Sequence, residues 1–179
     1  MDQTARFDEL SQLSHQRKLT QAEMAELSSL SQLLGRINPL LPATACIVAK
    51  VVILDKQGRL LVLWRSDKTP MPGRVDLPGG GINFGENPID GVVREAREET
   101  GLSVQNVHII ETFGYTFRKS YYLMLGYLGV AETASVNLSW EHDHYDWLDI
   151  VEVLALDGWQ ERHLRILNTA RPFLELGKK

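Results

Sequence analysis

One amphipathic helix constrains the fold of this chain more than any other feature of its sequence. The helix is predicted from Pro88 to Thr100, because Asn87 suits the N-cap and Pro88 suits the first helical position. At about 100° per residue, the apolar side chains gather within about 60° of Ile89 on one face. These side chains are Val92, Val93, Ala96 and Thr100. Such a stripe must be buried, so the pattern predicts a helix that packs on a sheet.

β-Branched and aromatic residues before and after this helix predict the strands of that sheet. A turn at residues 56–58 joins the first two strands, and a turn at residues 118–120 joins a longer pair. The predicted strands are residues 44–54, 60–64, 104–116, 121–130 and 145–148. Two helices are expected at residues 150–156 and 160–176, with Pro172 interrupting the second. Together, the predicted strands and helices indicate an α/β fold in which helices flank a mixed sheet.

Residues 1–42 predict a helical extension ahead of a domain of residues 43–179. The apolar residues of the extension recur at spacings of three and four, which is typical of helices. They are Phe7, Leu10, Leu13, Met24, Leu27, Leu30 and Leu34. Thr20 and Glu23 form a capping box before the second helix, and Gly35 is a candidate for its end. We expect a helical hairpin that packs on its own domain or acts as a dimerisation arm in a homodimer.

The charge balance excludes some classes of partner. With 19 lysines and arginines against 23 aspartates and glutamates, the net charge is −4, so neither a nucleic acid nor an anionic membrane is expected. No apolar run approaches the roughly 20 residues of a membrane-spanning helix, and residues 1–20 do not resemble a signal peptide. A cytoplasmic location is therefore expected. Cys46, the single cysteine, is expected to be a small buried hydrophobe.

The predicted helix carries three carboxylates on a second face. Glu95, Glu98 and Glu99 span an arc of about 100° at the same pitch, and like charges at these spacings each cost a helix about 0.2–0.5 kcal/mol. One interpretation is a solvated face whose acids pair with Arg94 and Arg97. The other is a metal site, because the glycine loop ahead of the helix offers backbone oxygens and room for phosphate groups. Hard oxygen ligands of this kind favour Mg²⁺.

The loop and the helix together resemble the Nudix box of the Nudix hydrolases. The family pattern is Gly, five residues, Glu, seven residues, Arg-Glu, an aliphatic residue, any residue, Glu-Glu, any residue, Gly and an aliphatic residue. The matching positions are Gly80, Glu86, Arg94, Glu95, Ala96, Glu98, Glu99, Gly101 and Leu102. Ala96 is small for its position, and every fixed polar or glycine position is filled. The resemblance extends over about residues 43–156.

This resemblance implies a Nudix-type α/β/α sandwich that hydrolyses a nucleoside diphosphate linked to another group. The implied cofactor is Mg²⁺, with Mn²⁺ as a substitute, because a chain of net charge −4 would otherwise repel a pyrophosphate. The implied metal ligands are a backbone carbonyl near Gly80 and the side chains of Glu95, Glu98, Glu99 and Glu141. Glu86 and Arg94 would form a supporting ion pair. The general base remains open among Glu95, Glu98 and Glu141.

Substrate recognition is expected outside the box. Arg65 and Arg74 flank the loop before it, and their guanidinium groups match phosphate oxygens. Aromatic candidates for stacking on a base are Tyr115, Phe117, Tyr121, Tyr122 and Trp147. The expected substrate is a small-molecule nucleotide, namely a nucleoside diphosphate sugar or ADP-ribose, because the helical extension suits a composite dimer site. The alternatives are a nucleoside triphosphate or dihydroneopterin triphosphate, and a nucleotide-sensing module without catalysis.

Overall fold

The computed structural model describes residues 2–34, 45–117 and 120–176, which belong to two units. The first unit is Met1–Thr44 and the second is Ala45–Lys179. Each unit has its own hydrophobic core, so each is described by itself.

The first unit contains two helices, α1 (Gln3–Gln16) and α2 (Gln21–Leu34). The predicted capping box is present at the start of α2. The Thr20 backbone N–H donates to Glu23 Oε2 at 2.8 Å, and the Glu23 N–H donates to Thr20 Oγ1 at 3.3 Å. The buried residues between the helices are Phe7, Leu10, Leu19 and Leu27. The helix end expected at Gly35 lies outside the described residues.

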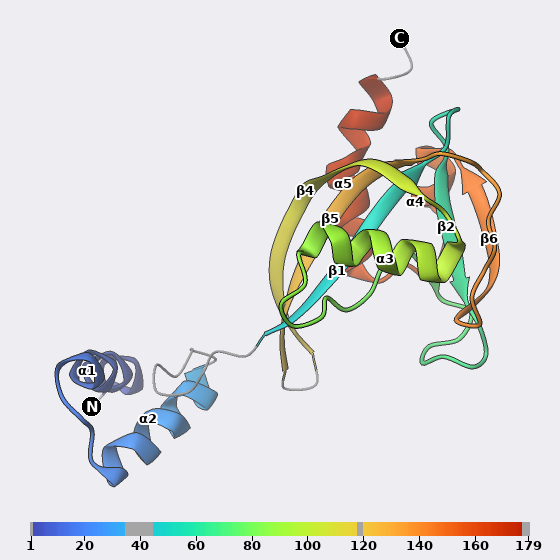
Figure 1. Cartoon of the computed structure of the whole chain (residues 1–179). Helices are drawn as coiled ribbons and strands as arrows, with labels where there is room; N and C mark the ends of the chain where they lie inside the picture. The colour runs from blue at the N-terminus through green and yellow to red at the C-terminus, as the bar shows by residue number, and fades with distance from the viewer. Residues whose placement is uncertain (1, 35–44, 118–119, 177–179) are drawn as a thin grey trace. The chain divides into compact units, whose positions relative to one another are not determined.

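The second unit is built on a mixed sheet (Figure 1). Its strands are β1 (Cys46–Leu54), β2 (Leu60–Arg65), β3 (Val75–Asp76), β4 (Val104–Phe117), β5 (Ser120–Ala131) and β6 (His142–Leu148). The order is β3-β2-β1-β5-β4, and β6 also pairs with β2. β1 and β5 run parallel and the other pairs are antiparallel. Both predicted hairpins and the predicted later strand are therefore present, and the short strand β3 was not expected.

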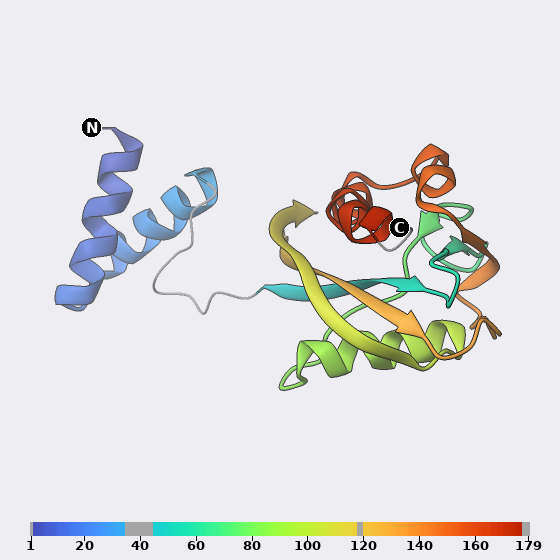
Figure 2. The same ribbon diagram turned by 90° about the horizontal axis from the view of Figure 1, so that it is seen from above.

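Helices cover both faces of this sheet. They are α3 (Pro88–Thr100), α4 (Ile150–Ala155) and α5 (Glu161–Leu176). Figure 2 shows α3 on one side of the strands and α4 and α5 on the other. The predicted α/β/α sandwich is thereby confirmed.

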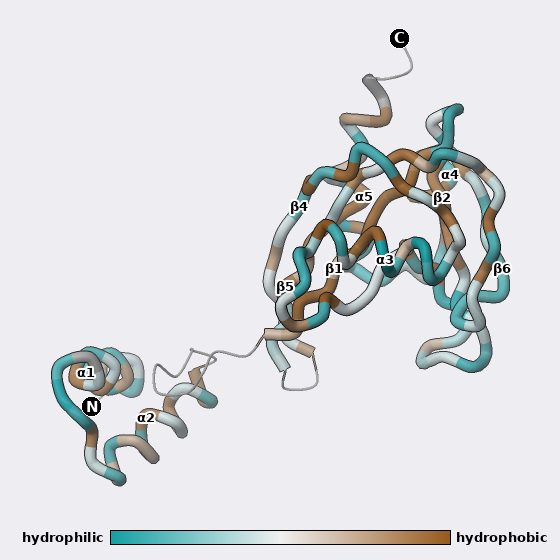
Figure 3. Tube along the Cα trace, viewed as in Figure 1, coloured by the Kyte–Doolittle hydropathy of each residue, from teal (hydrophilic) through white to brown (hydrophobic). Residues whose placement is uncertain are grey.

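Alternation along β1 divides the core between the two faces. Ala49, Val51 and Ile53 belong to the cluster that includes Val92 of α3, and Val52 belongs to the cluster that includes residues of α5. Successive strand residues point to opposite faces, so one strand supplies both cores. Figure 3 shows hydrophobic residues concentrated along the central strands.

Two sequence-based expectations were wrong. α5 continues through Pro172 without the expected interruption, because Ala170 and Leu174 on either side are buried and this packing offsets the missing backbone hydrogen bond. Cys46 is exposed, because it is the first residue of β1 and precedes the buried middle of the strand. Among the described helices, none has both the length and the apolar character that crossing a membrane requires.

The first unit offers a test of its independence. Leu27→Ala removes a fully buried side chain from its small core and should cost about 2–5 kcal/mol, which is comparable to the stability of a domain of this size. Amide hydrogen exchange should then show lost protection in α1 and α2 and unchanged protection from residue 45 onward. Gln32→Ala, at an exposed position of the same helix, is the control. Equal loss of protection in both units would contradict the division of the chain into two independent units.

Candidate active site

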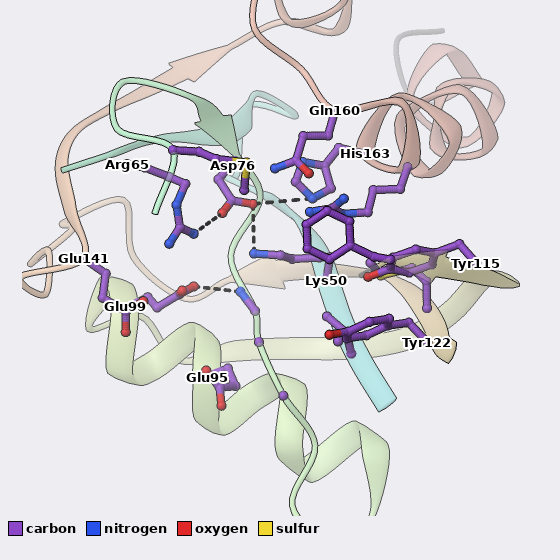
Figure 4. Close-up of a pocket in the computed structure, with 18 residues that line it drawn as sticks. Lys50, Arg65, Asp76, Glu95, Glu99, Tyr115, Tyr122, Glu141, Gln160 and His163 are labelled. Atoms are coloured by element: carbon purple, nitrogen blue, oxygen red, sulfur yellow. Dashed lines mark hydrogen bonds and ion pairs between the residues drawn. The ribbon is translucent and has the colours of Figure 1, made fainter. Parts of the chain in front are cut away.

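A cavity of about 380 Å³ lies where the glycine loop, α3 and the start of α5 come together. Figure 4 shows the carboxylates of Glu95 and Glu99 in the lower part of the view and Glu141 at the left. A group of charged side chains and His163 lies above Glu95 and Glu99, and Tyr115 and Tyr122 lie to the right. The cavity therefore has an acidic wall, a mixed charged wall and an aromatic wall.

Residues at its two ends determine where α3, the helix that carries the acidic wall, begins and ends. Asn87 Oδ1 accepts a hydrogen bond from the Ile89 N–H at 3.1 Å, and Gly101 ends α3 in the left-handed region with φ 70°. Both predicted ends of the helix are confirmed. Ile89 is 42% exposed, contrary to the predicted stripe, and the buried position in that turn is Gly91. A Cβ there would lie 2.6 Å from Ile82 Cδ1, so the loop packs directly on the helix backbone.

Glu95 and Gly80 are in close contact across the loop. A Cβ on Gly80 would lie 2.4 Å from Glu95 Oε2, a separation that real Cβ atoms essentially never show. Only glycine at this position admits the carboxylate so close to the backbone. The loop backbone and this acid, both expected to bind metal, are thus neighbours.

Glu99 holds the start of the glycine loop, at Gly79. Its side chain is buried, with 5% of the residue exposed, and its Oε2 accepts a hydrogen bond from the Gly79 N–H at 2.7 Å. Burial raises the pKa of Glu99 above its usual value, against the opposing effects of the Lys50 charge and the Gly79 N–H. Gly79 itself has φ 122° and lies against the Ala49 carbonyl of β1, where a Cβ would be 2.3 Å from the oxygen.

The remaining predicted residues differ in how they relate to the cavity. Glu141 and Arg65 line it. Glu98 does not line it, because its side chain is 60% exposed and pairs with Arg94 at 3.2 Å. Arg74 is exposed and also lies outside the lining. The structure therefore brings together Glu95 and Glu99 of α3, Arg65 of β2 and Glu141, which precedes β6, from three separate segments.

The expected pair of Glu86 and Arg94 holds the loop on the helix. Arg94 Nε donates to Glu86 Oε1 at 2.8 Å, and Arg94 Nη2 donates to Oε2 at 3.0 Å. The same guanidinium reaches Glu95 at 2.8 Å and the Gly81 carbonyl at 3.2 Å. These bonds from Arg94, with one from the Asn83 N–H, lower the pKa of Glu86 to about 2.

A buried ion cluster on the opposite wall was not predicted. Lys50 Nζ lies 2.8 Å from Asp76 Oδ1, and Arg65 Nη1 lies 2.9 Å from Asp76 Oδ2. Lys50 Nζ also donates to the Leu77 carbonyl at 2.7 Å. Burial raises the pKa of Asp76, but the Lys50 charge and His142 outweigh this effect and hold the pKa well below its usual value. The available signal was Lys50 itself, the charged residue in the middle of an otherwise apolar strand.

Two buried histidines stand beside this cluster. His163 Nε2 is 3.6 Å and His142 Nε2 is 4.0 Å from Asp76, and within the described part of the chain their ring nitrogens make no hydrogen bond. Burial lowers the pKa of His163, which is 1% exposed, to about 3, although Asp76 opposes this shift. The imidazole of His163 is therefore neutral at physiological pH.

The aromatic wall is formed by a stacked pair. The rings of Tyr115 and Tyr122 have centroids 5.1 Å apart and planes 14° apart, and the Arg162 guanidinium carbon lies 5.5 Å from the Tyr115 centroid. Phe117 also lines the cavity, whereas Tyr121 and Trp147, the other two aromatic candidates, do not. Arg118 and Lys119 of the predicted turn lie outside the described residues.

Comparisons with known proteins match the fold described above. A family model described as NUDIX domain matches residues 45–169. The 8-oxo-dGTP diphosphatase of Escherichia coli is 31% identical over 70 residues, 39% of this chain and 54% of that protein. The asymmetrical bis(5'-nucleosyl)-tetraphosphatase of Mus musculus is 32% identical over 90 residues, 47% of this chain and 61% of that protein. These matches thus span between half and two thirds of the relatives' length.

Solved structures share the fold over a larger part of the chain. The MutT protein from Methanosarcina mazei Go1 superimposes with a TM-score of 0.65 at 26% identity, covering 78% of this chain and 99% of that one. The NUDIX domain of Shewanella oneidensis NrtR, complexed with ADP ribose, gives a TM-score of 0.64 at 20% identity, covering 87% and 99%. At 20% identity, the similarity to the NUDIX domain of Shewanella oneidensis NrtR supports the fold alone.

The pair of Glu86 and Arg94 generates a first prediction. Glu86→Gln replaces the charged acceptor of two Arg94 bonds, so the loop should be held less firmly on α3. We expect a lower melting temperature together with a loss of turnover of about tenfold. Thermal unfolding and steady-state rates measure both. An unchanged melting temperature would show that Glu86 is not a support of the loop.

His163 generates a second prediction, on pH dependence. Its pKa is about 3 in the folded chain and about 6.5 unfolded, so the unfolded state binds the extra proton between these values. The stability that the neutral ring contributes is complete above pH 6.5 and falls by about 1 kcal/mol per pH unit as the pH drops toward 3. Denaturant unfolding at pH 7, 6, 5 and 4 should show a weaker pH dependence in His163→Leu. His144→Leu, at an exposed histidine, should keep the original pH dependence. Identical curves for the wild-type chain and both variants would show that His163 does not cause this pH dependence.

Proposed function

The chain belongs to the NUDIX family, and from this membership and the cavity we propose that it hydrolyses a phosphoanhydride bond in a nucleoside diphosphate linked to another group. The observation that carries the proposal is the close approach of Glu95 and Glu99 to the glycine loop, inside a cavity whose far wall is cationic. Acids and cations on facing walls suit a substrate whose phosphates need both metal ions and direct donors.

The donor set fits a divalent metal cation. Carboxylate oxygens and a backbone carbonyl are the hard ligands that Mg²⁺ and Mn²⁺ accept, and the missing side chain of Gly80 leaves Glu95 room beside the loop. The residues that would hold the metal are Gly80, Glu95, Glu98, Glu99 and Glu141. In the described part of the chain no three acids or histidines already form a complete metal cluster. When bound, such a cation neutralises phosphate charge and makes water more acidic.

The chain's own residues act on the substrate from the opposite wall. Lys50 and Arg65 carry two positive charges against one on Asp76, so the cluster presents a net positive charge to the phosphate groups. Asp76 fixes the direction of both cations, which orients the phosphates they hold. The base that takes a proton from the attacking water is proposed among Glu95, Glu98 and Glu141. Of these three, Glu95 and Glu141 line the cavity.

Within this class, the proposed substrates are a nucleoside diphosphate sugar or ADP-ribose, as the sequence led us to expect. The second candidate is a nucleoside triphosphate, which is favoured by the 31% identity with an 8-oxo-dGTP diphosphatase. We also propose that the protein works in the cytoplasm and that α1 and α2 act as a dimerisation arm. The support for such an arm is the exposed Leu33 on α2.

The test is product release from a panel of substrates with Mg²⁺, Mn²⁺ or EDTA. The panel holds nucleotide sugars, ADP-ribose, dinucleoside polyphosphates, nucleoside triphosphates and dihydroneopterin triphosphate. Metal-dependent cleavage of one group supports the proposal and identifies the substrate class. Binding of a nucleotide without cleavage would instead favour the sensing module.

The acidic wall generates the mutational prediction. Glu95→Gln and Glu99→Gln each remove one negative charge beside the loop and should lower kcat by about tenfold to a hundredfold while the melting transition survives. Glu132→Gln, at an exposed site bonded to Gln105, should leave kcat unchanged. Near-normal rates in both cavity variants would remove the metal-site interpretation.

A further inference from the structure

His163 is a buried residue of the cavity for which the proposed function has no role. Its ring lines the cavity from the first turn of α5, and only 1% of the residue is exposed. Within the described part of the chain, neither ring nitrogen makes a hydrogen bond. A buried polar group without a partner costs free energy in the folded state, so the position of this ring requires an explanation.

The acceptor that His163 faces is already occupied. His163 Nε2 lies 3.6 Å from Asp76 Oδ1, which is just beyond the range of a hydrogen bond. The same oxygen accepts the Leu77 N–H at 2.8 Å and lies 2.8 Å from Lys50 Nζ. A carboxylate oxygen has two lone pairs. Leu77 and Lys50 therefore use both, and the imidazole remains beside the oxygen without a bond.

Neighbouring residues hold the ring in this position. Trp159 meets it edge-on, with centroids 6.1 Å apart and planes at 89°. Trp159 is itself fixed, because its Nε1 donates to the Val153 carbonyl at 2.8 Å. Figure 4 shows His163 and Lys50 both directed at the Asp76 carboxylate. The imidazole is thus kept close to an oxygen that becomes available only if Lys50 leaves it.

Lys50 is the partner of Asp76 that has a reason to leave. Its ammonium has three N–H groups. One bonds to Asp76 and another to the Leu77 carbonyl at 2.7 Å, which leaves one for the cavity. A phosphate group competes with Asp76 for this ammonium, because both offer anionic oxygens. Transfer of the ammonium to the phosphate would leave Asp76 Oδ1 one donor short.

We propose that His163 supplies this donor: when a phosphate group enters the cavity, Lys50 turns toward it, and the His163 Nε2–H replaces Lys50 on Asp76 Oδ1. His163 is then a positioning residue, which acts on the substrate through Asp76 and Lys50. Arg65 stays on Oδ2, so one ion pair of the cluster is kept. The inference rests on the proposed function for the presence of a phosphate group. It adds that Asp76 directs Lys50 only until that group arrives.

Binding of a phosphate probe to the full chain tests this exchange of partners. The probe is imidodiphosphate with Mg²⁺, in which an N–H replaces the bridging oxygen of pyrophosphate, and calorimetry measures its Kd. His163→Leu removes the replacement donor and should weaken binding about tenfold. The melting temperature of the ligand-free variant should stay the same or rise, because an unpartnered buried polar group is gone. A loss of binding and a loss of stability are thus expected to separate.

Two further variants complete this series. His163→Gln keeps an N–H donor at the position and should bind the probe within about threefold of the wild-type chain. His144→Leu is the matched control, because it makes the same substitution at an exposed histidine outside the cavity lining. It should leave the Kd unchanged.

A double-mutant cycle tests whether His163 acts through Lys50. In a Lys50→Gln background the ammonium is absent, so the further change His163→Leu should weaken binding by less than about twofold. NMR of the imidazole protons gives a measurement that needs no change at Lys50. On addition of the probe to the wild-type chain, the Nε2 proton that is missing in His163→Leu should move downfield, as it does on forming a hydrogen bond.

The outcomes separate this inference from the function on which it rests. Equal Kd values for the wild-type chain and His163→Leu, or an Nε2 proton that does not move, overturn the exchange and leave phosphoanhydride hydrolysis intact. So does a full loss of affinity in a folded Lys50→Gln background. A lower melting temperature of His163→Leu, with no recovery in His163→Gln, would show a structural role instead.

The remaining outcomes concern both proposals. A wild-type chain that does not bind the probe overturns the exchange and also removes the phosphate-binding wall from the proposed function. A chain that binds the probe but cleaves no substrate of the panel loses the proposed hydrolysis and keeps the exchange. Weaker binding in His163→Leu at an undiminished melting temperature, recovered in His163→Gln, supports the inference.

Discussion

The position of the glycine loop depends on the buried carboxylate of Asp76. It bonds to Lys50 of β1 and Arg65 of β2, so one acid on β3 connects three strands. Removing one partner of a buried ion pair costs about 3–5 kcal/mol, because an uncompensated charge is left behind. Asp76 also accepts a hydrogen bond from the Leu77 N–H, and Glu99 accepts one from the Gly79 N–H, three residues after Asp76. The start of the glycine loop is therefore fixed by two buried carboxylates, one from the sheet and one from α3, and its end is held on α3 by Glu86 and Arg94.

Much of the fold follows from short-range patterns in the sequence. The bounds of α3 were predictable because Asn87 and Gly101 act on the backbone beside them. The course of α5 through Pro172 was not predictable, since burial of distant side chains compensates for the local defect. The exposure of Cys46 depended likewise on where β1 enters the sheet, which no local pattern records.

Part of the candidate site was likewise predictable from the sequence, and part was not. Periodicity placed Glu95, Glu98 and Glu99 on one face of a helix, but burial separates them, because the loop crosses only part of that face. The ion cluster joins residues distant in the chain, so spacing contains no trace of it. The stacked tyrosines are neighbours on the predicted hairpin of β4 and β5, and the sequence did name them as candidates. Lys50 was visible as an interruption of an apolar strand, although its partners in space were not.

The arrangement of the cavity separates two tasks between helices on opposite faces of the sheet. The acids come from α3, whereas Arg162 and Arg165 come from α5. On the first side, a side chain at position 80 would displace the Glu95 carboxylate from the loop. On the second side, Arg162 and Arg165 take no part in the bonds from Glu86, Arg94 and Glu99 that hold the loop. A substitution at either arginine would therefore change the lining beside β4 without removing a bond that holds the loop.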